Sequence, residues 1–483
     1  MGNIVIIGGG VAGLSAGITA AMAGHRVNVC EKNRNPGGNL VGWDRRGYHI
    51  DNCIHWLTGT NPKTKLYKSW QALGALGKYE LYQPETLYTA EHGEKTLSLY
   101  SSLEKTEEAM LAASEGDEAE IRSLIRAVKA MNVISGTDSF GFKAAGHFLT
   151  LAKYLGLTVR ELSERFNSPL LRSFIASFFG DEFGAVALIN VISTFTSGNG
   201  ALPKGGSSAM AAAMAERLKE VGGNLILGCE AVKLKTEVGR AVAVQLRDGR
   251  VLPADTVILA CDPKAASRLL PLALPDVLEN RYRTLSRFSS YHTAFGVSLE
   301  RLPFTSTFIL DIPDKYKSVL GGDRLVLREF SHEPGFSPVG KSLLEATVFV
   351  GSAFADRFIE KRRASEDAYR AYKGKLSDIV ERIITERFPA LAGRISRIDS
   401  WTPATYERYL GAHGGSYMSF ILPKNYIPKS FSPRASGYKN VLFATQWQTL
   451  PGGLPMAAGC GISAARAIGK VKAQKKREKL VTD

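Results

Sequence analysis

The amino-terminal stretch MGNIVIIGGGVAGLSAG places three consecutive glycines directly after a β-branched run, and this pattern constrains the fold more than any other. Ile4 to Ile7 predict a strand that is buried on both faces. Gly8, Gly10 and Gly13 have the G-x-G-x-x-G spacing of a dinucleotide-binding turn. The first glycine permits the tight turn, the second admits a pyrophosphate, and the third lets the next helix approach the sheet. The amino terminus of that helix then offers free N–H groups to the phosphates.

A carboxylate follows at the distance that such a site requires. Arg26 to Cys30 predict a second strand, and Glu31 ends it about twenty residues after the glycines. A carboxylate there can accept hydrogen bonds from both ribose hydroxyls of an adenosine. Strand, glycines, helix, strand and acid in this order favour a dinucleotide site. The alternative is a structural turn, with Glu31 as a solvated strand end.

Length and composition are those of a soluble globular protein with two or three domains. The 483 residues are 45% hydrophobic and 22% charged. No apolar run reaches the roughly 18 residues that span a bilayer, and the first strand begins at residue 3, so we expect a cytoplasmic protein without a signal peptide. The histidines form no cluster with acidic residues in the sequence, so we expect no metal site. Five scattered cysteines predict buried, reduced thiols: Cys30, Cys53, Cys229, Cys261 and Cys460.

The formal net charge of +15 raises the question of an acidic partner. Many basic residues crowd residues 470–479 near the carboxyl end. We expect either a solvated tail or one that lies peripherally on an anionic membrane surface. Nucleic acid is not expected, because no basic segment interleaved with aromatic residues is present. The oligomeric state is left open.

The closing stretch NVLFATQWQTLPGGLPMAAGCGISAARAI repeats the strand, loop and helix order of the amino terminus. Asn440 to Ala444 predict a strand, and Met456 to Ile468 predict a helix of small residues. The amino terminus of this helix is a second anion site. A flavin needs such a site, because reduction leaves negative charge around N1 and the C2 oxygen.

These motifs resemble the flavoprotein superfamily of phytoene desaturases, carotenoid isomerases and retinol saturases, which share the amine-oxidase-type FAD fold. Four stretches carry the resemblance, which covers nearly the whole chain: VIIGGGVAGLSAG with Glu31, EKNRNPGGN, GYHIDNCIHWLTG, and LPKGGSSAMAAAMAERL together with the closing stretch. The resemblance implies a non-covalently bound FAD and an FAD-dependent oxidoreductase or isomerase. HWLTG is closer to the retinol saturases and carotenoid isomerases than to the desaturases.

The resemblance also implies which residues bind the cofactor. Glu31 would hold the adenosine ribose, and Val232 would meet the adenine through its main chain. Many relatives have arginine in place of Asn39 and an acid in place of Gln446, so one phosphate contact is expected to be absent and FAD binding to be weaker. The implied residues are Gly8, Gly10, Val11, Ala12, Gly13, Glu31, Lys32, Gly37, Gly38, Asn39, Val232, Gln446, Gly453, Leu454 and Met456.

The predicted fold class is α/β: a Rossmann-like FAD-binding domain with an inserted α+β substrate domain, made of a helical cap and an antiparallel sheet. Amphipathic helical patterns dominate residues 97–197, and short strands with turn signals dominate residues 224–259. The expected segments are 1–96, 198–275 and 401–470 for the FAD-binding domain, 97–197 for the helical cap, 276–400 for the substrate domain and 471–483 for the basic tail.

The chemistry implied by the resemblance is desaturation, saturation or isomerisation of double bonds in a long apolar carotenoid, isoprenoid or retinoid substrate. Such a site needs a flavin in a dry tunnel and a group that moves the accompanying proton. His55 is the first candidate, although its ring could instead be held by a backbone partner. Tyr406 and Arg408 are weaker candidates, and Trp56 and Trp447 line the flavin ring or fill the core. The alternatives are action on an unsaturated fatty acid or hydrophobic amine, and a non-catalytic flavin-binding or lipid-carrier protein.

Overall fold

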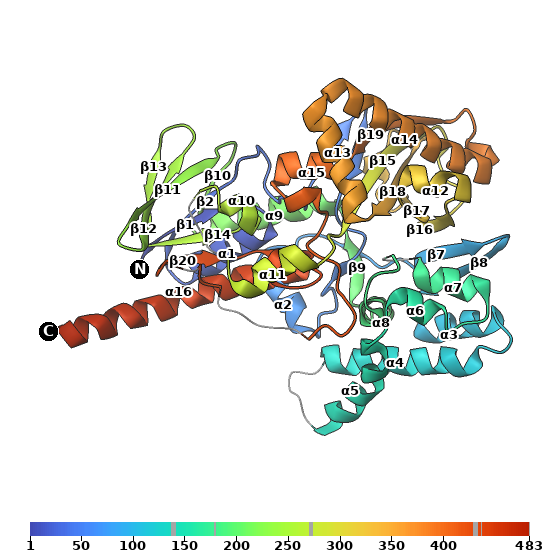
Figure 1. Ribbon diagram of the computed structural model, residues 1–483, viewed down its shortest axis with the longest axis horizontal. Helices are drawn as coiled ribbons and strands as arrows, with labels where there is room; N and C mark the ends of the chain where they lie inside the picture. Colours follow the sequence, from blue (N-terminus) through green and yellow to red (C-terminus); the bar gives the residue numbers. More distant parts are fainter. Residues whose placement is uncertain (137–141, 178–179, 270–273, 428–432, 436, 483) are drawn as a thin grey trace.

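The computed structural model describes residues 1–136, 142–177, 180–269, 274–427, 433–435 and 437–482. The molecule has two parts, and the part that contains the amino-terminal strand is built around a five-stranded parallel sheet (Figure 1). Ile4 and Ile6 pack on one face of this sheet, whereas Val5 and Ile7 pack on the other, which confirms a first strand buried on both faces. In spatial order the strands are β10 (Asn224–Ile226), β2 (Arg26–Cys30), β1 (Asn3–Ile7), β14 (Thr256–Leu259) and β20 (Val441–Phe443).

Helices from three distant parts of the chain cover one face of this sheet. They are α1 (Val11–Met22), α9 (Gly206–Glu220) and α16 (Leu454–Thr482). The small residues allow α1 and α16 to lie in close contact, since a Cβ on Gly461 would be only 2.2 Å from the Ala12 carbonyl oxygen (Figure 1). A three-stranded antiparallel sheet packs on the opposite face: β11 (Ala231–Glu237), β12 (Arg240–Leu246) and β13 (Val251–Pro253).

A seven-stranded sheet forms the second part of the molecule (Figure 1). Neighbouring strands are antiparallel, except for one parallel pair. In spatial order they are β19 (Ile395–Trp401), β15 (Ser289–Val297), β18 (Ser342–Val350), β17 (Arg324–Glu329), β16 (Thr307–Asp311), β7 (Thr86–His92) and β8 (Lys95–Tyr100), with β16 and β7 parallel. This order corrects the boundary predicted at residue 96, because β7 and β8 complete the second sheet rather than the first.

Two groups of helices enclose the seven-stranded sheet. Alternate residues of its strands point to opposite faces, so Phe308 packs with one group while Ile309 packs with the other. The first group is α12 (Asp314–Leu320), α13 (Ser352–Ala364) and α14 (Glu366–Arg387). The second is the predicted helical cap: α3 (Leu103–Ala112), α4 (Glu118–Gly136), α5 (Phe142–Leu155), α6 (Val159–Ser163), α7 (Pro169–Ala176) and α8 (Ala185–Thr196).

The remaining elements of the described residues are mostly short. They are β3 (Gly42–Arg45), β4 (Tyr48–Asp51), β5 (Leu57–Thr58), α2 (Lys65–Ala72), β6 (Leu81–Tyr82), β9 (Gly200–Pro203), α10 (Pro263–Ala266), α11 (Asp276–Thr284) and α15 (Pro403–Leu410), with 3-10 turns η1 (Pro334–Phe336), η2 (Pro389–Leu391), η3 (His413–Gly415) and η4 (Gln446–Gln448). β3 pairs with β4, and β9 pairs with both β5 and β6.

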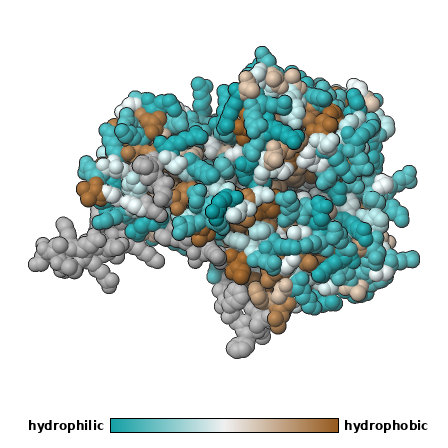
Figure 2. Space-filling model, viewed as in Figure 1, coloured by the Kyte–Doolittle hydropathy of each residue, from teal (hydrophilic) through white to brown (hydrophobic). Residues whose placement is uncertain are grey.

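The face in Figure 2 is largely hydrophilic, with apolar patches scattered over it. Within the described residues, no helix combines the length and the apolar character needed to cross a membrane. α16 continues as a helix to Thr482, but the side chains of residues 470–483 lie outside the described residues. The predicted contact of the basic tail with a membrane therefore stays a prediction.

Candidate functional site

A cavity of about 800 Å³ joins the two parts of the molecule. At one end it is lined by residues that follow β1, β2 and β14 at the carboxyl edge of the parallel sheet, where ligands of such sheets bind. At the other end it is lined by β16, β17, β18 and α8. A molecule bound at the edge of the parallel sheet therefore shares its cavity with whatever occupies the space beneath the helical cap.

The glycine turn forms the floor of the sheet end of the cavity. Gly8 has φ +112°, and a Cβ there would lie 2.7 Å from the Ala260 carbonyl oxygen. Gly10 lines the cavity, and its nearest neighbours would leave 3.7 Å to a Cβ. Gly13 does not line the cavity, because it packs under the turn with a Cβ position only 1.9 Å from the Gly8 carbonyl oxygen. Gly8 thus allows the tight turn, Gly10 leaves space in the cavity for a ligand, and Gly13 allows the helix to pack against the turn.

Glu31 lines the cavity beside this turn and is 5% exposed. Its Oε2 accepts from the Gly9 N–H and its Oε1 accepts from the Asn33 N–H, both at 2.8 Å. Each oxygen keeps a lone pair, so the carboxylate can also accept from two ligand hydroxyls. Lys32 lines the cavity as well, and its Nζ donates to the Arg408 carbonyl oxygen at 3.1 Å.

A second glycine pair faces the first turn. Gly37 and Gly38 have φ +110° and +63° and line the cavity. A Cβ on Gly38 would lie 3.1 Å from the Gly10 Cα, so a side chain there would close the space between the two turns. Val11 and Ala12 at the start of α1 also line this space. The side-chain-free cradle and the neighbouring Glu31 fit the phosphates and ribose of a dinucleotide.

The closing stretch supplies the remaining wall of the cradle. Gln446, Gly453, Leu454 and Met456 line the cavity, and α16 begins at Leu454, so a helix amino terminus lies at the cradle. The Gln446 Oε1 accepts from the Gly453 N–H at 2.8 Å. Val232 does not line the cavity, because β11 meets it through the preceding residue, Ala231.

The Asn39 side chain forms hydrogen bonds within the protein, so it is not free to bind a phosphate. Its Nδ2 donates to the Tyr417 carbonyl oxygen at 3.0 Å, and both its backbone and side-chain oxygens accept from Asn52 Nδ2 at 2.9 Å. It still lines the cavity between the glycine pair and Leu40. Asn39 therefore connects the cradle to the polar network beneath it.

Asn52 is the centre of that buried network, and sequence reasoning missed it. Its Oδ1 accepts from Trp401 Nε1 at 2.8 Å and from the Tyr406 hydroxyl at 2.9 Å. Tyr406 also lies 3.0 Å from Nε2 of His292, whose ring stacks on Trp401. Burial, together with Arg328, lowers the pKa of His292 to about 3, so its ring is neutral. No local pattern around Asn52 points to this role, because its partners Trp401 and Tyr406 are more than 300 residues away in the sequence.

Tyr406 and Arg408 do not occupy the places predicted for catalytic residues. Tyr406 is 3% exposed and contacts the network instead of the cavity. The Arg408 side chain is exposed and lies over the Tyr409 ring, with 5.4 Å from its Cζ to the ring centroid. The two residues are two positions apart on α15, so their side chains leave the helix in roughly opposite directions. Within α15, only Tyr409 and Leu410 line the cavity.

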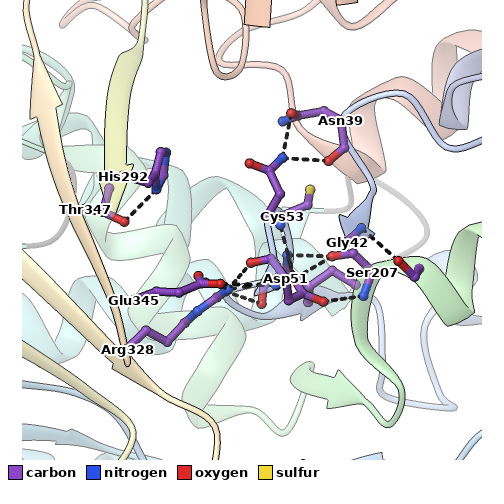
Figure 3. A network of polar contacts seen from close by, with 12 residues as sticks. Asn39, Gly42, Asp51, Cys53, Ser207, His292, Arg328, Glu345 and Thr347 are labelled. Atoms are coloured by element: carbon purple, nitrogen blue, oxygen red, sulfur yellow. Dashed lines mark hydrogen bonds and ion pairs between the residues drawn. The ribbon is translucent and has the colours of Figure 1, made fainter. Parts of the chain in front are cut away.

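A buried ion cluster forms part of the polar network shown in Figure 3, and its charged residues do not line the cavity. Arg328 Nη2 donates to Glu345 Oε2 at 2.8 Å and lies 3.8 Å from Asp51 Oδ1. Asp51 also accepts from the Ser207 hydroxyl at 2.7 Å, which ties β4 to α9. Burial raises the pKa of Glu345 to about 7, against the opposing effect of Arg328. The three charged residues come from β4, β17 and β18, and no spacing in the sequence pairs them.

His55 lines the cavity between β4 and β5, as expected for the segment HWLTG. No residue in the described ranges hydrogen-bonds to its ring, which lies edge-on to Tyr417 with centroids 6.5 Å apart. Burial, with Arg328 and His292, lowers the pKa of His55 well below its ordinary value. The site therefore holds a neutral imidazole whose nitrogens are available to a ligand.

Trp56 and Trp447 both line the cavity. Trp447 is 3% exposed and stacks on Tyr282 at 5.2 Å between centroids, so it also belongs to the core. Cys53 and Cys261 line the cavity as well, and burial raises the pKa of each thiol to about 12. Both cysteines are therefore neutral thiols at physiological pH.

The far end of the cavity, which we call the apolar chamber, lies between the seven-stranded sheet and the helical cap. None of its described lining residues is charged, whereas Glu31, Lys32, Glu230, Asp262 and Arg268 line the sheet end. The residues that line the chamber are Leu87, Met131, Val186, Ala187, Asn190, Val191, Phe288, Thr307, Ile309, Val326, Phe349 and Leu422.

Comparison with known proteins identifies the family. The sequence pattern described as flavin containing amine oxidoreductase matches residues 11–469. The chain belongs to this family. It is accordingly a flavin-dependent enzyme of the oxidoreductase or isomerase type, and the predicted family resemblance, fold class and flavin cofactor are confirmed.

Similar proteins and solved structures cover most of the chain. The chloroplastic prolycopene isomerase of Arabidopsis thaliana is 26% identical, over 90% of this chain and 77% of its own. The 4,4'-diaponeurosporene oxygenase of Staphylococcus aureus is 21% identical, over 98% of this chain and 99% of its own. The solved structure of cyclohexylamine oxidase from Brevibacterium oxydans superimposes with a TM-score of 0.59 at 15% identity, over 98% and 99% of the two chains, and shows that the fold is shared.

Proposed function

We propose that this flavoenzyme desaturates, saturates or isomerises carbon–carbon double bonds in a long apolar substrate of the carotenoid or isoprenoid type. The observation that carries the proposal is the continuity of the cavity, which leads from the glycine cradle and Glu31 into the uncharged apolar chamber. An extended hydrocarbon chain placed in the chamber buries its surface against side chains and reaches toward the cofactor end.

The residues that would hold FAD follow from the cavity. Glu31 would accept from the adenosine ribose, the Gly8–Gly10 turn and Gly37–Gly38 would meet the phosphates, and the start of α16 would face the flavin. When bound, FAD supplies the two-electron redox chemistry. Non-covalent binding is part of the proposal, since Cys53 and Cys261 line the cavity as neutral thiols, which are poor nucleophiles.

The protein's own contributions are exclusion of water and movement of a proton. The chamber walls pack as one core cluster around Leu87, Val191 and Ile309, which keeps the reacting carbons dry. His55 is a neutral imidazole whose ring has no hydrogen-bond partner among the described residues. It would accept or return the proton that accompanies a double-bond change.

The named activities of the relatives support this substrate class, because prolycopene isomerase and 4,4'-diaponeurosporene oxygenase are both named for polyenes. A fatty acid or a hydrophobic amine carries a charged end, and the described chamber lining offers no counter-charge. Membership of the flavin containing amine oxidoreductase family argues against the non-catalytic carrier alternative. The cytoplasmic location and the membrane contact of residues 470–479 stay predictions from the sequence.

The test uses the purified, flavin-loaded chain and a panel of polyenes under anaerobic and aerobic conditions. Chromatography and mass spectrometry of the products should show a changed number or geometry of double bonds in at least one polyene. The Glu31→Ala variant serves as the cofactor-depleted control. Binding of polyenes without any change in their double bonds would refute the proposed reaction. A failure both to bind and to convert any polyene would refute the proposed substrate class as well.

A further inference from the structure

One amide interrupts the helical wall of the apolar chamber. α8 turns one face to the cavity, and of the four residues on that face only Asn190 is polar. Its neighbours Ile189 and Val191 are 0% and 4% exposed, whereas Asn190 keeps an exposed side chain. No hydrogen bond joins the Asn190 side chain to any residue in the described ranges. The amide is therefore available to whatever fills the chamber.

The opposite wall carries one hydroxyl. Thr307 and Ile309 on β16 both line the cavity, while Phe308 between them packs into the other core. Thr307 is 9% exposed, and its hydroxyl makes no hydrogen bond to a described residue. The sheet wall and the helical wall thus each present one polar group to a chamber that is otherwise apolar.

A pure hydrocarbon is a poor match for these groups. It would cover the donors and acceptor of the Asn190 amide without replacing their hydrogen bonds to water, which is unfavourable. A ligand hydroxyl or carbonyl would satisfy them, since an amide both donates and accepts. A carboxylate would bring a charge into a chamber whose described lining has no cation.

We infer that the chamber selects an apolar chain that carries a neutral oxygen function, a hydroxyl or a carbonyl, and that Asn190 is the specificity-determining residue that hydrogen-bonds to it. Thr307 assists from the sheet wall. The inference rests on the proposed function and narrows its substrate class. Sites that hydrogen-bond a polar substrate group discriminate strongly against the analogue that lacks the group.

Binding to the flavin-loaded full chain tests the inference separately from turnover. The probes are all-trans-retinol, its hydrocarbon analogue with hydrogen in place of the hydroxyl, and retinoic acid, each titrated by quenching of protein fluorescence. Retinol should bind roughly tenfold more tightly than the hydrocarbon, the effect of about one hydrogen bond. Asn190→Leu, which is close in size, should bring the ratio of the two dissociation constants near one.

Two further variants control for packing. Val186→Leu changes the same face of α8 without changing its polarity, so it should shift both dissociation constants by a similar factor. Thr307→Val removes only the hydroxyl and should lower the ratio by a smaller factor, which provides a test should Asn190→Leu fold poorly. Equal binding of alcohol and hydrocarbon by the wild type, or an unchanged ratio in both Asn190→Leu and Thr307→Val, would overturn the inference while polyene turnover still supported the proposed function. Failure to bind any of the probes and to convert any polyene would refute both.

Discussion

The Gly9 N–H donates to Glu31 Oε2 at 2.8 Å, so the glycine turn and the end of β2 are held together by the carboxylate that faces the cavity. Glu31 thereby orders the cradle and presents its remaining lone pairs to a ligand. In the proposed cofactor site, Glu31 would contribute to binding directly, through the ribose, and indirectly, through the shape of the turn.

Glu31→Ala should empty the cofactor site. Loss of the hydrogen bonds to the carboxylate should weaken flavin binding by about 2 kcal/mol or more, which is roughly thirtyfold. The measurement is visible flavin absorbance per chain after gel filtration. Asp255→Ala is the matched control, because Asp255 Oδ2 also accepts from a backbone N–H of β1, at Asn3. Full flavin occupancy in Glu31→Ala would contradict the assigned contact.

Gly13→Ala should disrupt the first βα unit. Its Cβ would lie 1.9 Å from the Gly8 carbonyl oxygen, so α1 must move away from the turn, at a cost of roughly 3 kcal/mol in the free energy of unfolding. Gly459→Ala in α16 is the comparison, since nothing lies within 4 Å of its Cβ position. Alanine there should stabilise the helix by about 0.5–1 kcal/mol. Denaturant titration of both variants checks the pair, and equal stabilities would contradict the packing argument.

Tyr406→Phe should destabilise the protein, whereas Arg408→Ala should change little. The phenylalanine variant removes a buried hydroxyl that donates to Asn52, which is worth about 1–3 kcal/mol. Arg408 is exposed, so its loss should stay within about 0.5 kcal/mol. Thermal unfolding and steady-state turnover should be measured together. A Tyr406→Phe variant with normal stability and lost turnover would return this residue to a catalytic role.

Glu345 should make stability fall as pH rises toward 7. Its folded pKa of about 7 lies above the unfolded value of about 4.3, so the folded state binds more protons between these limits. The loss reaches at most about 4 kcal/mol and is nearly complete above pH 7. His292, with its folded pKa lowered to about 3, acts in the opposite direction below about pH 6.5.

Because these effects overlap, the informative quantity is the difference between wild type and Glu345→Gln. Denaturant titrations from pH 5 to 8 should show the variant gaining stability relative to wild type as pH rises. A difference that does not change with pH would mean that Glu345 stays ionised in the folded protein.

His55→Phe should retain the flavin, because His55 is not part of the glycine cradle. The turnover rate should fall by roughly a hundredfold, because the phenyl ring cannot transfer the proton. The lowered pKa of His55 predicts that the wild-type rate shows no inflection near pH 6.5 from this group. Single-turnover rates across pH would check this. An inflection near 6.5 that disappears in His55→Gln would show that the ring is solvated and charged in acid.

The sequence predicted the cofactor half of the site because its signals are local. These signals are the first strand, the glycine spacing and Glu31, and all of them lie within some thirty residues of sequence. The turn between strand and helix requires glycine for steric reasons, which makes the spacing informative. The family resemblance extended the predicted cofactor site to the Gly37–Gly38 pair and to the start of α16. The predicted main-chain contact of Val232 with the adenine stays a prediction, and the residue of β11 that lines the cavity is its neighbour Ala231.

The polar network beneath the cavity could not be predicted, because it depends on how the strands of the second sheet are ordered. Arg328 and Glu345 lie on neighbouring strands, and Asp51 comes from a hairpin nearly 300 residues earlier. The same ordering moved β7 and β8 into the substrate sheet. Tyr406 lies in a family-like motif, but in the structure its hydroxyl donates a buried hydrogen bond to Asn52 and the residue is not part of the cavity lining.

The close contact of α1 with the start of α16 has a consequence for synthesis of the protein. The ribosome makes the glycine turn first and the residues around Gly453 and Met456 more than 400 residues later, yet both belong to one cradle. An emerging polypeptide therefore lacks one wall of the proposed flavin pocket until the residues around Gly453 have been made. Stable loading with flavin is expected to await the last strand and helix, β20 and α16.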